Sequence, residues 1–111
     1  DIDVLVSPTV PAPAARAGES VVTYPDGSTE PVTPAYCRMT FPADVCGIPA
    51  LSVPCGFSSS GLPIGIQFMG RPFSEEILLK VGQVYESATP WARHNPDLPP
   101  PGAGGNEGST P

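Results

Sequence analysis

Large apolar side chains are confined to about four short segments of this chain, because stretches of proline, glycine and small polar residues separate them. The 111 residues include 17 prolines and 12 glycines. The longest such stretches run from Ala12 to Ala35 and from residue 95 to the C-terminus. Proline fixes φ and removes a hydrogen-bond donor, so we expect these stretches to add little to the core. A chain of this length has little core to spare, and we expect it to be marginally stable by itself.

The pattern predicts two parts. Residues 1–94 hold all the apolar segments and form part of one domain, whereas residues 95–111 form a disordered tail rich in proline and glycine. Because Asp1 leads directly into an apolar run with no initiator methionine, we expect the C-terminal piece of a longer protein.

The first half of the chain contains few clear elements. The β-branched run Ile2–Val6 predicts a short strand buried on both faces. An extended linker follows, and Asp26–Gly27 indicates a turn near the surface. Thr40, Pro42 and Asp44 predict one short helical turn, which Gly47 and Pro49 would end.

The second half predicts a β-hairpin and a helix. The strands are "ALSVPCGF" and "LPIGIQFMG", joined by the loop "SSSG". Pro54 should lie at a strand end or bulge, and Gly65 and Gly70 suggest close backbone approaches. The closing helix follows Ser74, with two glutamates in its first turn. Its expected buried stripe comprises Ile77, Leu78, Val81, Val84, Tyr85 and Ala88.

Charge and cysteine content exclude some functions. The net charge is −6, from eleven acidic and five basic residues, and the basic residues are scattered. No cationic face is therefore available for nucleic acid, and no apolar run approaches membrane-spanning length. Three cysteines without a CxxC spacing do not predict a zinc site. Cys46 and Cys55 are interpreted as small buried residues in a reducing compartment, the cytoplasm or an organelle.

The serines Ser58–Ser60 raise the question of a nucleophile. A catalytic serine needs a base within hydrogen-bond reach and an oxyanion site. The chain's histidine, His94, lies beside the predicted tail, and its lysine, Lys80, lies on the closing helix. Without a G-x-S-x-G turn, the three serines are better explained as the bend of the hairpin. From the residues alone, we expect no catalytic machinery in this segment.

Four sequence blocks in order carry a resemblance. They are "DVLVSPTVPAPA", "RMTFPADVCGIPALSVPCGF", "GLPIGIQFMGRPF" and "EEILLKVGQVYESATPW". The second block follows the pattern R-x-T-x-P-x-N-x-x-G-x-P-A-x-S-x-P-x-G, and the third follows G-L-P-x-G-x-Q-x-x-G. Together they resemble the C-terminal part of the amidase signature family, over residues 1 to about 94.

The resemblance implies a fold and a chemistry. Members of this family are α/β proteins, in which an α/β/α sandwich surrounds a mixed sheet. This chain would contribute a strand, a short helical turn, a β-hairpin and the closing helix. Members cleave carboxamides with a nucleophilic serine, a second serine in a cis peptide and a lysine, all upstream of the matched blocks. This segment alone is therefore expected to be inactive and to contain no catalytic residue. No metal or organic cofactor is implied.

Within this resemblance, the stretch from Thr40 to Gly47, with Asp44, is expected to form one wall of the acyl pocket. Asp44 stands where the family usually has asparagine, and a carboxylate cannot donate a hydrogen bond as an amide does. Cys37 stands near a position that is commonly acidic in the glutamyl-tRNA(Gln) amidotransferase A chain. Cys37 and Arg38 together favour a general amidase over that amidotransferase.

Two alternatives remain open. One is the amidotransferase A chain, which would use glutamine-derived ammonia inside a complex; the other is a truncated, non-catalytic interaction module. The expected partners are a small-molecule amide, the rest of the amidase domain, and either a second copy of the chain or amidotransferase subunits. Neither nucleic acid nor a membrane is expected as a partner.

Overall fold

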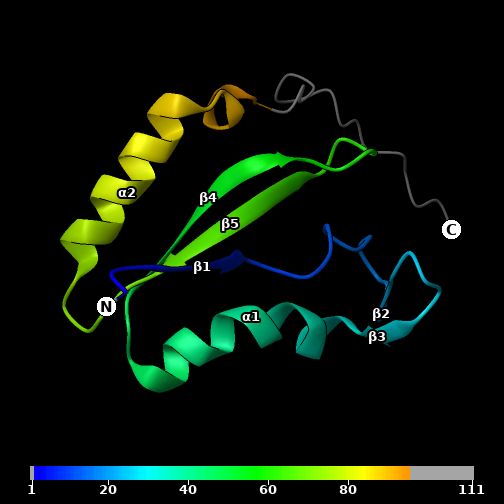
Figure 1. Ribbon diagram of the computed structural model, residues 1–111. Helices are drawn as coiled ribbons and strands as arrows, with labels where there is room; N and C mark the ends of the chain where they lie inside the picture. Colours follow the sequence, from blue (N-terminus) through cyan, green and yellow to red (C-terminus); the bar gives the residue numbers. More distant parts are fainter. Residues whose placement is uncertain (1, 96–111) are drawn as a thin grey trace, which may run out of the picture.

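The computed structural model describes residues 2–95 of the chain (Figure 1). Its strands are β1 (Leu5–Pro8), β2 (Val21–Thr23), β3 (Thr29–Pro31), β4 (Ala50–Phe57) and β5 (Pro63–Met69). Its helices are α1 (Val32–Cys46), α2 (Glu75–Ala88) and the short 3-10 helix η1 (Trp91–Arg93). The predicted disordered tail, residues 95–111, lies outside the described residues apart from Asn95.

The main sheet has three strands in the order β1-β5-β4, and both pairings are antiparallel. Helix α2 packs on the β4–β5 side of one face, and Figure 1 shows α1 along the opposite side of the sheet. Strands β2 and β3 form a separate hairpin beside the start of α1. The α/β class and the order strand, helix, hairpin, closing helix are confirmed.

The core lies between α2 and the sheet. Val53, Phe68 and Leu78 are buried there, and partly buried residues surround them: Val4, Leu51, Ile66, Val81 and Tyr85. Alternate residues of a strand point to opposite faces, so Val53 and Phe68 place this face of the sheet against α2. An added Cβ on Gly82 would lie 2.6 Å from Leu51 Cδ2. The missing side chain at Gly82 therefore lets α2 approach the sheet closely.

The predicted stripe of α2 is only partly right. Leu78, Val81 and Tyr85 pack on the core, but Val84 is 70% exposed and Ile77 is 43% exposed. The buried face is narrower than the apolar pattern because Gly82, which is buried, lies against the sheet.

The hairpin β4–β5 is confirmed in its details. Ser58 N–H donates to Leu62 O at 2.8 Å, and Gly61 N–H donates to Ser58 O at 2.9 Å, so the serines form the turn. The register shifts between Pro54 and Gly56, which places a bulge where proline cannot donate to the ladder.

The close backbone approach expected at Gly65 is also present. A Cβ on Gly65 would lie 2.8 Å from Thr9 Oγ1. A Cβ on Gly70 would likewise lie 2.3 Å from Ser74 Oγ. Any larger residue at these two positions would therefore displace its neighbours.

Helix α1 corrects the prediction of one short helical turn. It runs for 15 residues from Val32 and passes through both Pro34 and Pro42. Pro34 falls in the first turn, where a backbone N–H has no intrahelical partner in any case. Pro42 forfeits one helical bond inside the helix. The predicted end was right, because Gly47 caps α1 in the left-handed region at φ +62°.

The prediction of a first strand buried on both faces was wrong. The strand begins at Leu5 rather than Ile2, and Leu5 and Val6 are 51% and 57% exposed. The reason is that α2 reaches β4 and β5 while β1 lies at the edge of the sheet.

Two further expectations need correction. Cys46 is exposed near the end of α1 and Cys55 is half-buried, so neither is the fully buried residue expected. After the predicted linker, Val21–Thr23 pairs with Thr29–Pro31 in the β2–β3 hairpin, whose strands were not predicted. Its turn at Asp26–Gly27 is confirmed by a Gly27 φ of +84°.

No helix within residues 2–95 combines the length and the apolar character needed to cross a membrane.

Candidate functional site

The three predicted pocket-wall residues all belong to α1 or its cap. Thr40 is half-buried, and its hydroxyl donates to Cys37 O at 3.3 Å. Asp44 is exposed, one helical turn further along on the same side. Gly47 ends the helix, and its N–H donates to Asp44 O at 3.2 Å. The helix therefore presents Thr40 and Asp44 together, with the cap beside them.

A different face of α1 forms an open apolar groove of about 480 Å³. Its lining residues are Pro34, Cys37, Arg38, Phe41, Pro42, Val45 and Cys46. Phe41 is 60% exposed and Val45 is 68% exposed. Thr40, Asp44 and Gly47 are not among these residues. The repeat of Cys37, Phe41 and Val45 at intervals of four is the sequence signal of this groove, and the two prolines obscured it.

A charged cluster joins the first half of α1 to the β2–β3 hairpin. The Arg38 guanidinium binds both carboxylate oxygens of Glu30, with Nη2–Oε1 at 2.8 Å and Nη1–Oε2 at 3.2 Å. The Tyr24 hydroxyl also donates to Glu30 Oε1. Because this bond stabilises the neutral phenol, the pKa of Tyr24 is raised above its ordinary value of 10.0. The Arg38 side chain therefore has a structural role, because it holds α1 against β3.

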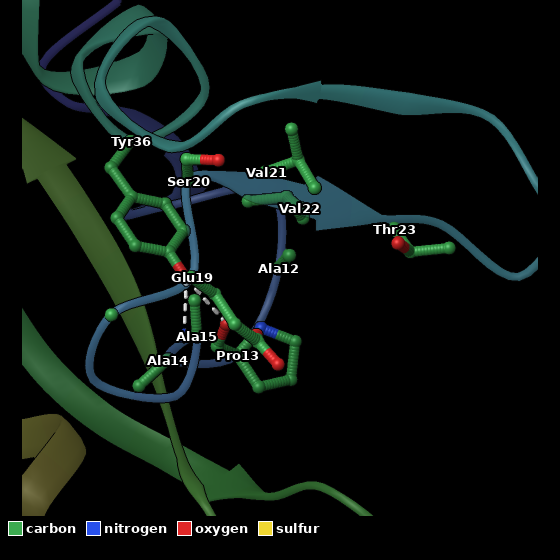
Figure 2. Close-up of a pocket in the computed structure, with 11 residues that line it drawn as sticks. Ala12, Pro13, Ala14, Ala15, Glu19, Ser20, Val21, Val22, Thr23 and Tyr36 are labelled. Carbon is green, nitrogen blue, oxygen red and sulfur yellow. Dashed lines mark hydrogen bonds between the residues drawn. The ribbon is translucent and has the colours of Figure 1, made fainter.

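A second contact ties α1 to the loop that precedes β2. Figure 2 shows Tyr36 reaching from α1 toward this loop. Its hydroxyl donates to Pro13 O at 2.8 Å and accepts from Ala15 N–H at 2.7 Å. The loop, β2 and Tyr36 enclose a hollow of about 610 Å³, walled mainly by alanine, proline and valine. Both hydrogen bonds of the Tyr36 hydroxyl are already made within the protein. We therefore interpret the hollow as a gap beside this contact and not as a ligand site.

The face of the sheet toward α1 carries a polar row, which was not predicted from the sequence. The β-ladder places Ser7 beside Gln67, and Gln67 beside Ser52, so one row crosses all three strands. Gln67 is only 3% exposed. Its Nε2 donates to Ser7 Oγ at 3.3 Å and to Met39 O of α1 at 3.0 Å.

A second polar pair extends this row. Thr9 Oγ1 and Ser52 Oγ lie 2.5 Å apart, in the space left open by the missing side chain of Gly65. The sequence signal was the alternation Leu51-Ser52-Val53 and Ile66-Gln67-Phe68, in which the polar residue points away from α2. Both Ser52 and Gln67 are fixed positions of the two motif patterns that carry the family resemblance.

The serines, the lysine and the histidine considered as nucleophile and base each make other contacts. The hydroxyl groups of Ser58 and Ser60 form a hydrogen bond in the hairpin loop, with an Oγ–Oγ distance of 2.9 Å. The exposed Lys80 pairs with Glu76 at 2.6 Å. His94 packs edge-on against Phe57, with ring centroids 5.4 Å apart, and its Nδ1 lies 3.2 Å from Pro90 O. No cluster of three or more metal-ligating side chains occurs in the part of the chain that the structure describes.

Comparison with known proteins finds similar sequences among amidases and amidotransferase subunits. The chain is 50% identical over 97 residues to an amidase of Pseudomonas putida, and this covers 87% of the chain and 21% of the amidase. It is 43% identical over 99 residues to the A chain of the glutamyl-tRNA(Gln) amidotransferase of Picosynechococcus sp. (strain ATCC 27264 / PCC 7002 / PR-6), covering 87% of this chain and 19% of that relative. The chain therefore spans about a fifth of the length of these relatives.

The fold has solved counterparts. A structure of 6-aminohexanoate cyclic dimer hydrolase complexed with substrate superposes with a TM-score of 0.73 at 34% identity, over 86% of this chain and 21% of the hydrolase. A crystal structure of an amidase gives a TM-score of 0.72 at 28% identity, over 78% of this chain and 20% of that one. The family model described as "Amidase" matches residues 1–79. With the motif blocks lying on the elements just described, this chain belongs to the amidase family.

Proposed function

We propose that this chain is the C-terminal segment of an amidase that hydrolyses carboxamide C–N bonds with a serine outside these 111 residues. The observation that carries the proposal is the family match over residues 1–79, together with 50% identity to an amidase. Residues 1–94 would supply strands, the covering helix and one wall of the acyl pocket. The segment alone would be inactive.

The wall would be the side of α1 that carries Thr40 and Asp44, ended by Gly47. The Thr40 hydroxyl is bonded to the helix backbone and Asp44 is exposed. This side of α1 would therefore contact a substrate through the Asp44 carboxylate and through the surface of the helix. In the complete enzyme the serine would attack the amide carbonyl, release ammonia or an amine, and leave an acyl-enzyme for water to hydrolyse. No step in this reaction requires a metal or organic cofactor.

A chimeric enzyme tests this function. The 97-residue stretch of the Pseudomonas putida amidase that aligns with this chain is replaced by the present sequence, and ammonia release from acetamide, hexanamide and benzamide is measured. We expect hydrolysis of at least one of these amides by the chimera. A chimera that is folded but inactive on every amide cleaved by the parent amidase would contradict the proposal.

A second candidate is the A chain of an amidotransferase, which the 43% identity to such a protein favours. It would use a small amide, glutamine, and act within a complex with other subunits. Glutaminase activity that appears only with those partners would support this candidate, whereas partner-independent hydrolysis of simple amides supports the first.

A further inference from the structure

Gln67 is a buried polar side chain in the middle of a sheet. It lies on the central strand β5, is 3% exposed, and its amide nitrogen is shared between Met39 O at 3.0 Å and Ser7 Oγ at 3.3 Å. Burying an amide is unfavourable unless its hydrogen bonds are made. An apolar residue would satisfy the sheet equally well, so the amide at Gln67 requires another explanation.

The hydrogen bond to Met39 reaches across from the sheet to the middle of α1. Two nearby residues of the same helix bind other parts of the chain: Tyr36 binds the loop before β2, and Arg38 binds Glu30 of β3. In the described part of the chain, the bond from Gln67 is the side-chain hydrogen bond that joins α1 to the three-stranded sheet. It therefore ties α1 to the three-stranded sheet, whereas the contacts of Tyr36 and Arg38 tie the helix to the loop before β2 and to β3.

A proline close to that point weakens the hydrogen-bond ladder of the helix. Pro42 lies three residues after Met39 and cannot donate the helical hydrogen bond to Arg38 O. Thr40 and Asp44 lie on either side of Pro42. Because a helix can bend where a bond of its ladder is missing, the contact at Met39 helps to fix the height of this part of α1 above the sheet.

We propose that Gln67 is a positioning residue that sets the distance between α1 and the sheet, and through it the width of the acyl pocket beside Thr40 and Asp44. This inference rests on the proposed function. Because Gln67 acts on a wall and not on the reacting atoms, its loss should weaken substrate binding more than the chemical step. It should also change the discrimination between short and long acyl groups.

The test uses the full-length amidase that carries this segment. Gln67→Met keeps the length of the side chain and removes the donor, while Gln83→Met makes the same change at an exposed position of α2. For Gln67→Met we expect KM for hexanamide to rise about tenfold, with a small change in kcat and a changed ratio of kcat/KM between acetamide and hexanamide. Gln83→Met should match the unaltered enzyme. Unchanged KM and an unchanged ratio in Gln67→Met would overturn the proposal.

A second readout does not depend on activity. Hydrogen exchange of the backbone amides of α1 should be faster in Gln67→Met than in Gln83→Met, because the helix loses its bond to the sheet. Equal exchange in the two variants would overturn the role of Gln67. If the unaltered protein releases no ammonia from acetamide, hexanamide or benzamide, the proposed function fails, and the exchange data still decide whether Gln67 positions α1. Should Gln67→Met not fold, Gln67→Asn keeps the amide but is too short to reach Met39 O, and the same two outcomes apply to it.

Discussion

Leu78 and Leu79 are neighbours on α2 with opposite surroundings, which makes them a matched pair for testing the core. Leu78 is 2% exposed and packs with Val53 and Phe68, whereas Leu79 is 63% exposed. Both changes to alanine remove the same atoms from the same helix. Any difference in stability between the two variants therefore comes from burial.

The expected loss for Leu78→Ala follows from its burial. Removing three buried carbons at about 0.8 kcal/mol each costs about 2.4 kcal/mol, and the cavity left behind raises the loss to about 3 kcal/mol. For Leu79→Ala the loss should stay below about 1 kcal/mol, because little surface is buried and alanine is a slightly better helix former. The free energies of unfolding should thus differ by about 2 kcal/mol or more.

The measurement is urea unfolding followed by far-UV circular dichroism, with the two variants and the unaltered chain compared at equal protein concentration. The urea midpoint of Leu78→Ala should fall well below that of Leu79→Ala, with the same slope. Equal midpoints for the two variants would refute the assignment of this interface as the core.

Three further outcomes follow from single residues. Gly47→Ala should lower the stability by about 1 kcal/mol in a thermal melt, because alanine is strained at φ +62°. Glu30→Gln should return the raised pKa of Tyr24 toward 10.0 in a spectrophotometric titration. In the unaltered chain, the hydrogen bond from Tyr24 to Glu30 contributes its full stability below pH 10.0. This contribution is lost as pH rises through the folded-state pKa of Tyr24. Hydrogen bonds from the Ser28 hydroxyl and then its backbone N–H lower the pKa of Asp26 below 3.8, so this contribution is present above that value and is lost as pH falls through the folded-state pKa. Ser28→Ala should raise the pKa of Asp26 in an NMR titration.

The elements whose signals are local could be predicted from the sequence. The hairpin follows from two apolar runs around a glycine-closed loop, and α2 follows from its acidic first turn and its apolar spacing. The bulge at Pro54 follows from the missing donor of proline. Each of these depends on residues near one another in the chain, so neighbouring residues carried enough information.

Helix α1 could not be predicted in the same way, because its support is tertiary. Pro34 and Pro42 argue locally against a long helix, while Tyr36 and Arg38 hold its first half through contacts with residues outside the helix. The predicted helical turn therefore lies within α1 but covers only its second half, and the role of this part as a pocket wall stays a prediction. The polar row centred on Gln67 was missed because its members lie far apart in sequence and meet only in the β-ladder.

We propose that this chain completes an amidase and does not itself carry the catalytic groups. Complementation in trans tests it most directly: the 111-residue chain and the remaining part of the full-length amidase are produced as separate polypeptides, and ammonia release from amides is measured for each alone and for the mixture. We expect each polypeptide alone to be inactive, and the mixture to form a complex that hydrolyses amides. Amide hydrolysis by the purified 111-residue chain alone would contradict it.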